Sequence, residues 1–189
     1  MGESAILVGP RCSGKTLAGK ELARILETPF VDADDIFVEM CRKNVEAYVA
    51  EYGWEGFRKA ETKAIEEICR EYQHVQIVLT PGGGAVAHDQ GEEYRQRNVK
   101  LLQAFGTIIY LLPEADLEKS AGILTDRLLA DPTTAGQRPS LTGEQDQYKD
   151  MLTAITKRHT LYSAAANITF YTGKKTVEEV AKNIAVWIK

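Results

Sequence analysis

The stretch Gly9-Pro10-Arg11-Cys12-Ser13-Gly14-Lys15-Thr16 follows the short apolar run Ala5-Ile6-Leu7-Val8 near the start of the chain. It matches the pattern G-x-x-x-x-G-K-[ST], a loop whose backbone N–H groups surround phosphate at the beginning of a helix. In this pattern the lysine reaches the outer phosphates of a nucleoside triphosphate, and the threonine hydroxyl ligates Mg²⁺. The stretch therefore predicts a nucleoside triphosphate site made by Gly9, Arg11, Cys12, Ser13, Gly14, Lys15, Thr16 and Leu17.

Length and composition are those of one globular domain. The chain has 189 residues, of which 44% are apolar and 26% are charged, enough for one α/β domain with a substantial core. Its net charge of −4 predicts no general attraction to nucleic acid or to an anionic membrane surface. We expect neither a membrane span nor a signal peptide, because no apolar run reaches about 18 residues and the first strand begins early. Widely spaced Cys12, Cys41 and Cys69 favour free thiols in a cytoplasmic protein.

The apolar pattern alternates between strands and helices along the chain. Short apolar runs predict strands at 4–8, 30–32, 75–79, 107–112 and 166–171, with helices at 14–27, 33–42, 44–52, 55–72, 92–104, 114–129 and 146–163. A last helix begins at the capping box Thr176-Val177-Glu178-Glu179. This alternation predicts an α/β fold, with a mainly parallel sheet covered by helices on both faces. Ligands bind beyond the carboxyl ends of such strands, so we expect the chemistry after residues 8, 32 and 79.

Acidic residues follow the second predicted strand, in Asp32-Ala33-Asp34-Asp35. Asp32 and Asp34 share one side of an extended segment, where one acid would hold Mg²⁺ and the other would take a proton from a hydroxyl. The same pattern is typical of a helix N-cap followed by acids in the first turn. The neighbouring phosphate loop favours the functional interpretation.

Three glycines follow the third predicted strand, in Thr80-Pro81-Gly82-Gly83-Gly84. Each glycine costs more conformational entropy on folding than any other residue, and a tight turn needs only one. Three in a row indicate a ligand that lies directly on bare backbone, with a generous turn as the alternative.

Arginines occur at four further positions of interest. Arg58 and Glu61 are three residues apart, which allows an ion pair on a helix surface, and Arg158 lies in another predicted helix. From spacing alone, plain surface salt bridges are the favoured interpretation. Arg127 and Arg138 flank the stretch 130–139, which has two prolines and a glycine and predicts either a lid or an idle insertion. Lid arginines that close over a triphosphate would neutralise charge and expel water.

Taken together, these residues resemble the shikimate kinase family, small P-loop kinases of the nucleoside monophosphate kinase-like group. The matching pieces are the phosphate loop, Asp32-x-Asp34, Gly56-Phe57-Arg58-x-x-Glu61, Gly82-Gly83-Gly84-Ala85-Val86, Arg138-Pro139-Ser140-Leu141 and Arg158-x-x-Leu161-Tyr162. The resemblance implies a three-layer αβα fold on a five-stranded parallel sheet of order 2-3-1-4-5. It further implies one domain over 1–189, a mobile lid near 127–145 and a shikimate-binding helical region near 33–61.

The resemblance also implies an activity: transfer of the γ-phosphate of ATP to the 3-hydroxyl of shikimate, in aromatic amino-acid biosynthesis. Its catalytic residues would be Asp34 as the base, Lys15 at the transferring phosphoryl group and Arg138 on the lid. The residues that would bind shikimate are Asp34, Arg58, Gly82, Gly83, Gly84, Arg138 and Arg158. Arg127 would pack near adenine, and Thr16 with Asp32 would position Mg²⁺. Thr172-Gly173-Lys174-Lys175 lacks a clear copy of the family's adenine-contacting segment.

Two other interpretations stay open at this point. One is a different kinase of the same group, acting on gluconate or on a nucleoside monophosphate. The other is a non-catalytic binding module with the same fold, because fold alone does not prove activity. The resemblance otherwise predicts a cytoplasmic monomer that takes ATP and shikimate as small-molecule partners, with no nucleic-acid or membrane partner.

Overall fold

The structure is a computed structural model, and it describes residues 3–89, 91–130 and 142–188. In chain order its strands are β1 (Ser4–Val8), β2 (Phe30–Asp32), β3 (Val78–Thr80), β4 (Gly106–Leu112) and β5 (Ile168–Tyr171). Its helices are α1 (Lys15–Leu26), α2 (Ala33–Cys41), α3 (Val45–Glu71), α4 (Glu92–Phe105), α5 (Leu117–Ala130), α6 (Gln147–Ala165) and α7 (Val177–Ile188). The predicted alternation of strands and helices is therefore confirmed.

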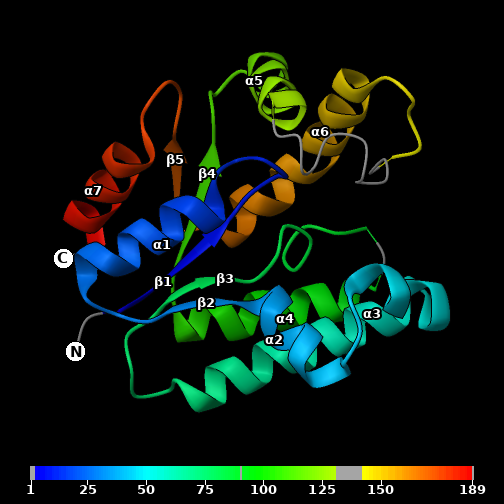
Figure 1. The fold of residues 1–189 in the computed structure, drawn as a ribbon, viewed down its shortest axis with the longest axis vertical. Coiled ribbons are helices and arrows are strands. Elements are labelled where there is room, and N and C mark those ends of the chain that lie inside the picture. Colours follow the sequence, from blue (N-terminus) through cyan, green and yellow to red (C-terminus); the bar gives the residue numbers. More distant parts are fainter. Residues whose placement is uncertain (1–2, 90, 131–141, 189) are drawn as a thin grey trace.

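The five strands form one parallel sheet in the order β2-β3-β1-β4-β5 (Figure 1), as the family resemblance implies. The central strand β1 pairs with β3 and β4, so that Ile6 lies between Leu79 and Ile108. Every residue of β1 and β4 is buried. Buried parallel strands of this kind are typical of sheets with helices on both faces.

The two faces of the sheet have separate apolar cores. Ile6 and Val8 face the helices α3, α4, α5 and α6, whereas Ala5 and Leu7 face α1 and α7. This alternation along β1 follows from the two-residue period of a strand. Figure 1 shows the resulting layers, with α1 and α7 on one side of the sheet and α3 and α4 on the other. The three-layer prediction is confirmed.

Two predicted boundaries are wrong in detail. The third strand begins at Val78 and not at 75, because Val75 is exposed in the turn that follows α3. The predicted helices 44–52 and 55–72 are one element, α3, interrupted only at Gly53, whose φ of 70° and ψ of 175° are not helical. The predicted break thus falls at a glycine, which tolerates this conformation.

Helix ends follow the predicted caps. The Thr176 N–H donates to Glu179 Oε2, and the Glu179 N–H donates to Thr176 Oγ1, which is the predicted capping box.

Within the described residues, no helix is both long enough and apolar enough to cross a membrane. Most of the predicted lid, with Arg138 and Ser140, lies outside the described residues.

Candidate active site

The phosphate loop joins β1 to α1 at the carboxyl edge of the sheet. Gly9 has a φ of 150°, and a Cβ built there would lie only 2.5 Å from the Leu111 carbonyl oxygen, so a side chain does not fit. Gly14 has a left-handed conformation and precedes the first turn of α1. The loop thus directs the helix N-terminus, with its unpaired N–H groups and positive dipole end, toward any bound phosphate.

Lys15 lies at the concave side of this loop, where its Nζ donates a 2.8 Å hydrogen bond to the Pro10 carbonyl. Arg11 and Cys12 are half-buried in the loop, and Ser13 is buried. Leu17 projects from the first turn of α1 and is 62% exposed. The loop therefore presents a lysine and a helix N-terminus together.

Two oxygen ligands lie beside the loop. Thr16 Oγ1 is 3.5 Å from Asp32 Oδ2, while Asp32 Oδ1 accepts a hydrogen bond from the Asp34 N–H as the N-cap of α2. Both interpretations of Asp32 are thus compatible, because its two carboxylate oxygens face different partners. Across the described ranges, no group of three or more His, Cys, Asp or Glu side chains forms a metal cluster. Two protein oxygens fit Mg²⁺, which usually completes its shell with water and substrate phosphates.

The glycine segment Gly82–Gly84 lies between this loop and the acidic end of β2. A Cβ built on Gly82 would lie 3.2 Å from Asp34 Oδ1, and one built on Gly83 would lie 4.0 Å from Lys15 Nζ. A Cβ on Gly84 would lie 2.7 Å from Arg58 Nη1, so a side chain there would displace the guanidinium. The tertiary structure therefore brings together Lys15, Asp34 and Arg58 around bare backbone.

Arg58 and Glu61 form a buried ion pair, which corrects the expected surface pair. Arg58 Nη1 donates to Glu61 Oε1 at 3.0 Å and to Oε2 at 2.8 Å, and the two side chains are only 7% and 6% exposed. The guanidinium also lies 5.5 Å from the Trp54 ring and 5.0 Å from the Phe57 ring. Spacing places two residues on one face of a helix but does not say which face is covered, and here Gly84 and Gly91 lie against the Arg58 side chain.

Burial changes the protonation of both site carboxylates. It raises the pKa of Glu61 to about 7, because the desolvation penalty exceeds the favourable effect of Arg58. Asp34 is exposed to solvent on one side, yet the protein around its carboxylate raises its pKa by desolvation, and Asp32 raises it further. Lys15 and Arg58 act in the opposite direction on Asp34. Both acids thus hold a proton more readily than ordinary surface carboxylates.

This pKa shift predicts a pH-dependent loss of stability. The folded protein holds the Glu61 proton more tightly than the unfolded chain, so the free energy of unfolding falls as pH rises from 4.5 toward about 7. Glu61→Gln cannot ionise and should remove this contribution, on the order of 1–3 kcal/mol between those limits. Urea unfolding of both proteins across this pH range measures the difference. A difference that does not vary with pH would contradict the assignment.

Arg158 and Arg127 approach the site from helices on the other side of the glycine segment. Arg158, half-buried on α6, lowers the pKa of both Tyr162 and Glu61, so both predicted carboxylate-binding arginines act on Glu61. Arg127, on α5, donates to the Cys12 carbonyl at 3.4 Å and to the Gly173 carbonyl at 3.2 Å. Arg127 thereby connects the phosphate loop to the segment after β5, which the sequence left without a role.

Tyr162 belongs to the matched piece Arg158-x-x-Leu161-Tyr162, but its sequence position predicts no function. In the structure its hydroxyl donates to the Gly83 carbonyl, from a position 79 residues further along the chain. The sequence contains one indication that Tyr162 belongs to the site: it follows Arg158 by four residues and therefore lies on the same face of the helix. Arg138 alone among the predicted site residues lies outside the described residues.

A parallel sheet of this strand order, with a phosphate loop after β1 and an acidic, arginine-lined site beside it, defines an α/β P-loop kinase. The family model for shikimate kinase matches residues 11–189, and the chain belongs to that family. A shikimate kinase 2 from Syntrophotalea carbinolica is 35% identical over 169 residues, which cover 88% of this chain and 86% of that protein.

Solved structures agree with this assignment. Shikimate kinase from Bacteroides thetaiotaomicron superimposes with a TM-score of 0.77 at 25% identity, covering 98% of each chain. Shikimate kinase from Acinetobacter baumannii in complex with shikimate has a TM-score of 0.79, covering 98% of this chain and 92% of that one. At 24% identity the latter likeness shows the shared fold.

Proposed function

We propose that this chain transfers the γ-phosphate of ATP to the 3-hydroxyl of shikimate, giving shikimate 3-phosphate and ADP, a step in aromatic amino-acid biosynthesis. The observation that carries the proposal is the meeting of Lys15, Asp34 and Arg58 at the Gly82–Gly84 segment. This arrangement places a phosphate-binding lysine, a carboxylate and a guanidinium around the same stretch of bare backbone. Shikimate is a small ring that carries hydroxyls and one carboxylate, and it matches both groups.

On the donor side, the phosphate loop would bind the triphosphate through its backbone N–H groups and Lys15. In forming that contact Lys15 would exchange its bond to the Pro10 carbonyl for the outer phosphates. Thr16 and Asp32 would hold Mg²⁺, which neutralises charge on the phosphates when bound. Arg127, already bonded to the loop carbonyl of Cys12, would lie near adenine.

On the acceptor side, Asp34 would orient the reacting hydroxyl and accept its proton. Its raised pKa suits a base that works near neutral pH. Arg58 and Arg158 would bind the carboxylate of shikimate, since guanidinium groups form strong, directional pairs with carboxylates. Glu61 holds Arg58 in place for this task.

Further parts of the proposal rest on the family resemblance alone. They are the role of Arg138 on a lid near 127–145, the shikimate-binding region near 33–61, and the single domain over 1–189. A cytoplasmic, monomeric state belongs with them.

Arg158→Ala is expected to weaken shikimate binding about 10- to 100-fold, because a desolvated carboxylate loses a charged partner. ATP affinity should change less than about two-fold, since the phosphate loop provides that site. Isothermal calorimetry with each ligand measures both effects. Lys157→Ala, an exposed neighbour on α6, is the matched control. Equal losses for the two ligands would contradict the carboxylate role.

A coupled ADP-release assay tests the function itself. The protein is supplied with ATP and Mg²⁺ and, separately, with shikimate, gluconate, AMP or CMP. Turnover with shikimate alone is expected. Turnover with a nucleotide or with gluconate, but not with shikimate, would make the chain a different kinase. Nucleotide binding without any turnover would make it a non-catalytic module.

A further inference from the structure

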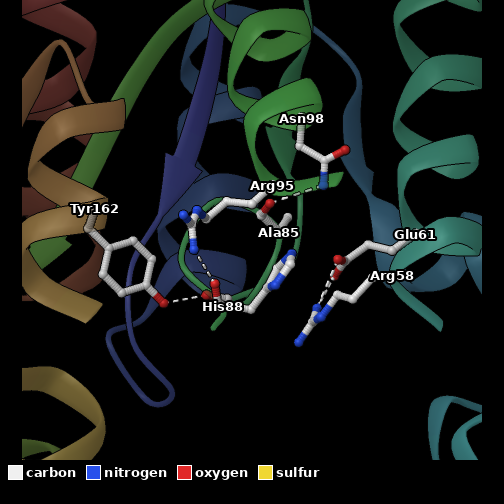
Figure 2. Close-up of polar contacts among 8 residues, drawn as sticks. Arg58, Glu61, Ala85, His88, Arg95, Asn98 and Tyr162 are labelled. Atoms are coloured by element: carbon white, nitrogen blue, oxygen red, sulfur yellow. Dashed lines mark hydrogen bonds and ion pairs between the residues drawn. The ribbon is translucent and has the colours of Figure 1, made fainter. Parts of the chain in front are cut away.

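The glycine segment and the residues that follow it are held by side chains of two helices. From α6, the Tyr162 hydroxyl donates to the Gly83 carbonyl. From α4, Asn98 Nδ2 donates to the Ala85 carbonyl at 3.0 Å, and Arg95 Nη1 donates to the His88 carbonyl at 2.6 Å. Figure 2 shows Tyr162 on one side of this segment and the Arg58–Glu61 pair on the other.

The Tyr162 side chain is held in place by burial and by ring stacking. It is 1% exposed, and its ring stacks on that of Tyr110 with centroids 4.9 Å apart and planes 21° from parallel. Tyr110 in turn belongs to β4, where its hydroxyl is 3.3 Å from His159 Nδ1. The central sheet therefore fixes the Tyr162 ring, and the ring fixes the position of its hydroxyl.

The hydroxyl lies next to two groups of the proposed acceptor site. It donates to the Gly83 carbonyl, and Arg158 lies one turn earlier on the same face of α6. Burial raises the pKa of Tyr162 to about 12, although Arg158 lowers it in part. The group thus keeps its proton, and its ability to donate, at neutral pH.

We propose that Tyr162 is a positioning residue for the acceptor, because its hydroxyl holds the Gly83 peptide and lies on the same helix face as Arg158. This inference rests on the proposed function, in which Gly83 and Arg158 bind shikimate. The peptide at Gly83 has no side chain to anchor it, and small displacements of binding groups are costly in transfer reactions. In this role Tyr162 would act through Gly83 and Arg158.

Tyr162→Phe tests the proposal, since it removes the hydroxyl and keeps the stacked ring. The KM for shikimate is expected to rise about 5- to 20-fold, as for loss of one or two hydrogen bonds, while the KM for ATP changes less than about two-fold. Tyr110→Phe is the matched control, because it removes a neighbouring buried hydroxyl that contacts His159 and not the glycine segment. Thermal unfolding of both variants measures any general loss of stability.

A double variant that also lacks the Arg158 guanidinium distinguishes a positioning role of Tyr162 from a general loss of stability. If Tyr162 orients Arg158, the double variant Tyr162→Phe/Arg158→Ala should lose less shikimate affinity than the product of the two single effects. Asn98→Leu is a second route, because it releases the same segment at Ala85 and leaves the tyrosines unchanged. It should raise the shikimate KM selectively, even if Tyr162→Phe fails to fold.

The outcomes are distinct. Absence of shikimate turnover in the unaltered protein would remove the proposed function. If the unaltered protein turns over shikimate, two results would overturn the positioning role: the same shikimate KM in Tyr162→Phe and Tyr110→Phe, or an equal rise of the shikimate and ATP KM values in Tyr162→Phe. If Tyr162→Phe does not fold, an unchanged shikimate KM in a folded Asn98→Leu protein would also overturn it.

Discussion

Asp34→Asn is expected to lower kcat for shikimate phosphorylation by about 100-fold or more, the usual range for loss of a general base. The amide keeps the size of the side chain and can still bond a hydroxyl, but it cannot take the proton. The carboxylate lies beside Gly82 and belongs to α2, not to the phosphate loop. ATP affinity should therefore stay within about two-fold.

Steady-state kinetics and ATP titration of the same preparation measure this prediction. Asp35→Asn is the control, because Asp35 is the next residue on α2 and is exposed. This substitution removes the same single negative charge as Asp34→Asn. Because phosphoryl transfer often has a loose transition state, positioning alone could supply most of the rate. Near-normal turnover in Asp34→Asn would show this and would exclude Asp34 as the base.

Above the Glu61 pKa of about 7, Arg58→Ala is expected to lower the free energy of unfolding by about 3–5 kcal/mol. The buried Glu61 carboxylate would then have to stay charged without its partner or take up a proton. Shikimate binding should be lost as well, whereas ATP binding should persist in the folded fraction. The double variant Arg58→Met/Glu61→Leu removes both charges and keeps similar volume. It should regain most of the stability but none of the shikimate affinity.

The chain offers a close control for this pair. Glu67 and Arg70 lie on the same helix with the same three-residue spacing, but their side chains are 43% and 71% exposed. Arg70→Ala should therefore change stability little, since solvent screens exposed ion pairs. Urea unfolding of the four proteins makes the comparison. Similar losses in the free energy of unfolding for Arg58→Ala and Arg70→Ala would contradict the prediction that burial makes the Arg58–Glu61 pair costly to break.

Local pattern was sufficient for most of the architecture. The apolar runs at β1 and β4 and the helical periodicity between them predict the alternation, because a parallel sheet requires a crossover between neighbouring strands. The strand order came from the family resemblance, and pairing agrees with it. The third strand was misplaced because its neighbouring residues, Val75 and Ile77, are as apolar as those that pair.

The sequence by itself determined the phosphate loop, because Gly9, Gly14, Lys15 and Thr16 act within one local strand–loop–helix unit. It also placed acids and glycines at the ends of β2 and β3. The tertiary structure alone decided that Arg58 is buried while Arg70 is exposed, although both pairs have the same spacing. It alone joined Tyr162 to Gly83, because contacts between distant segments depend on how helices pack on the sheet and leave no periodic signal in the chain.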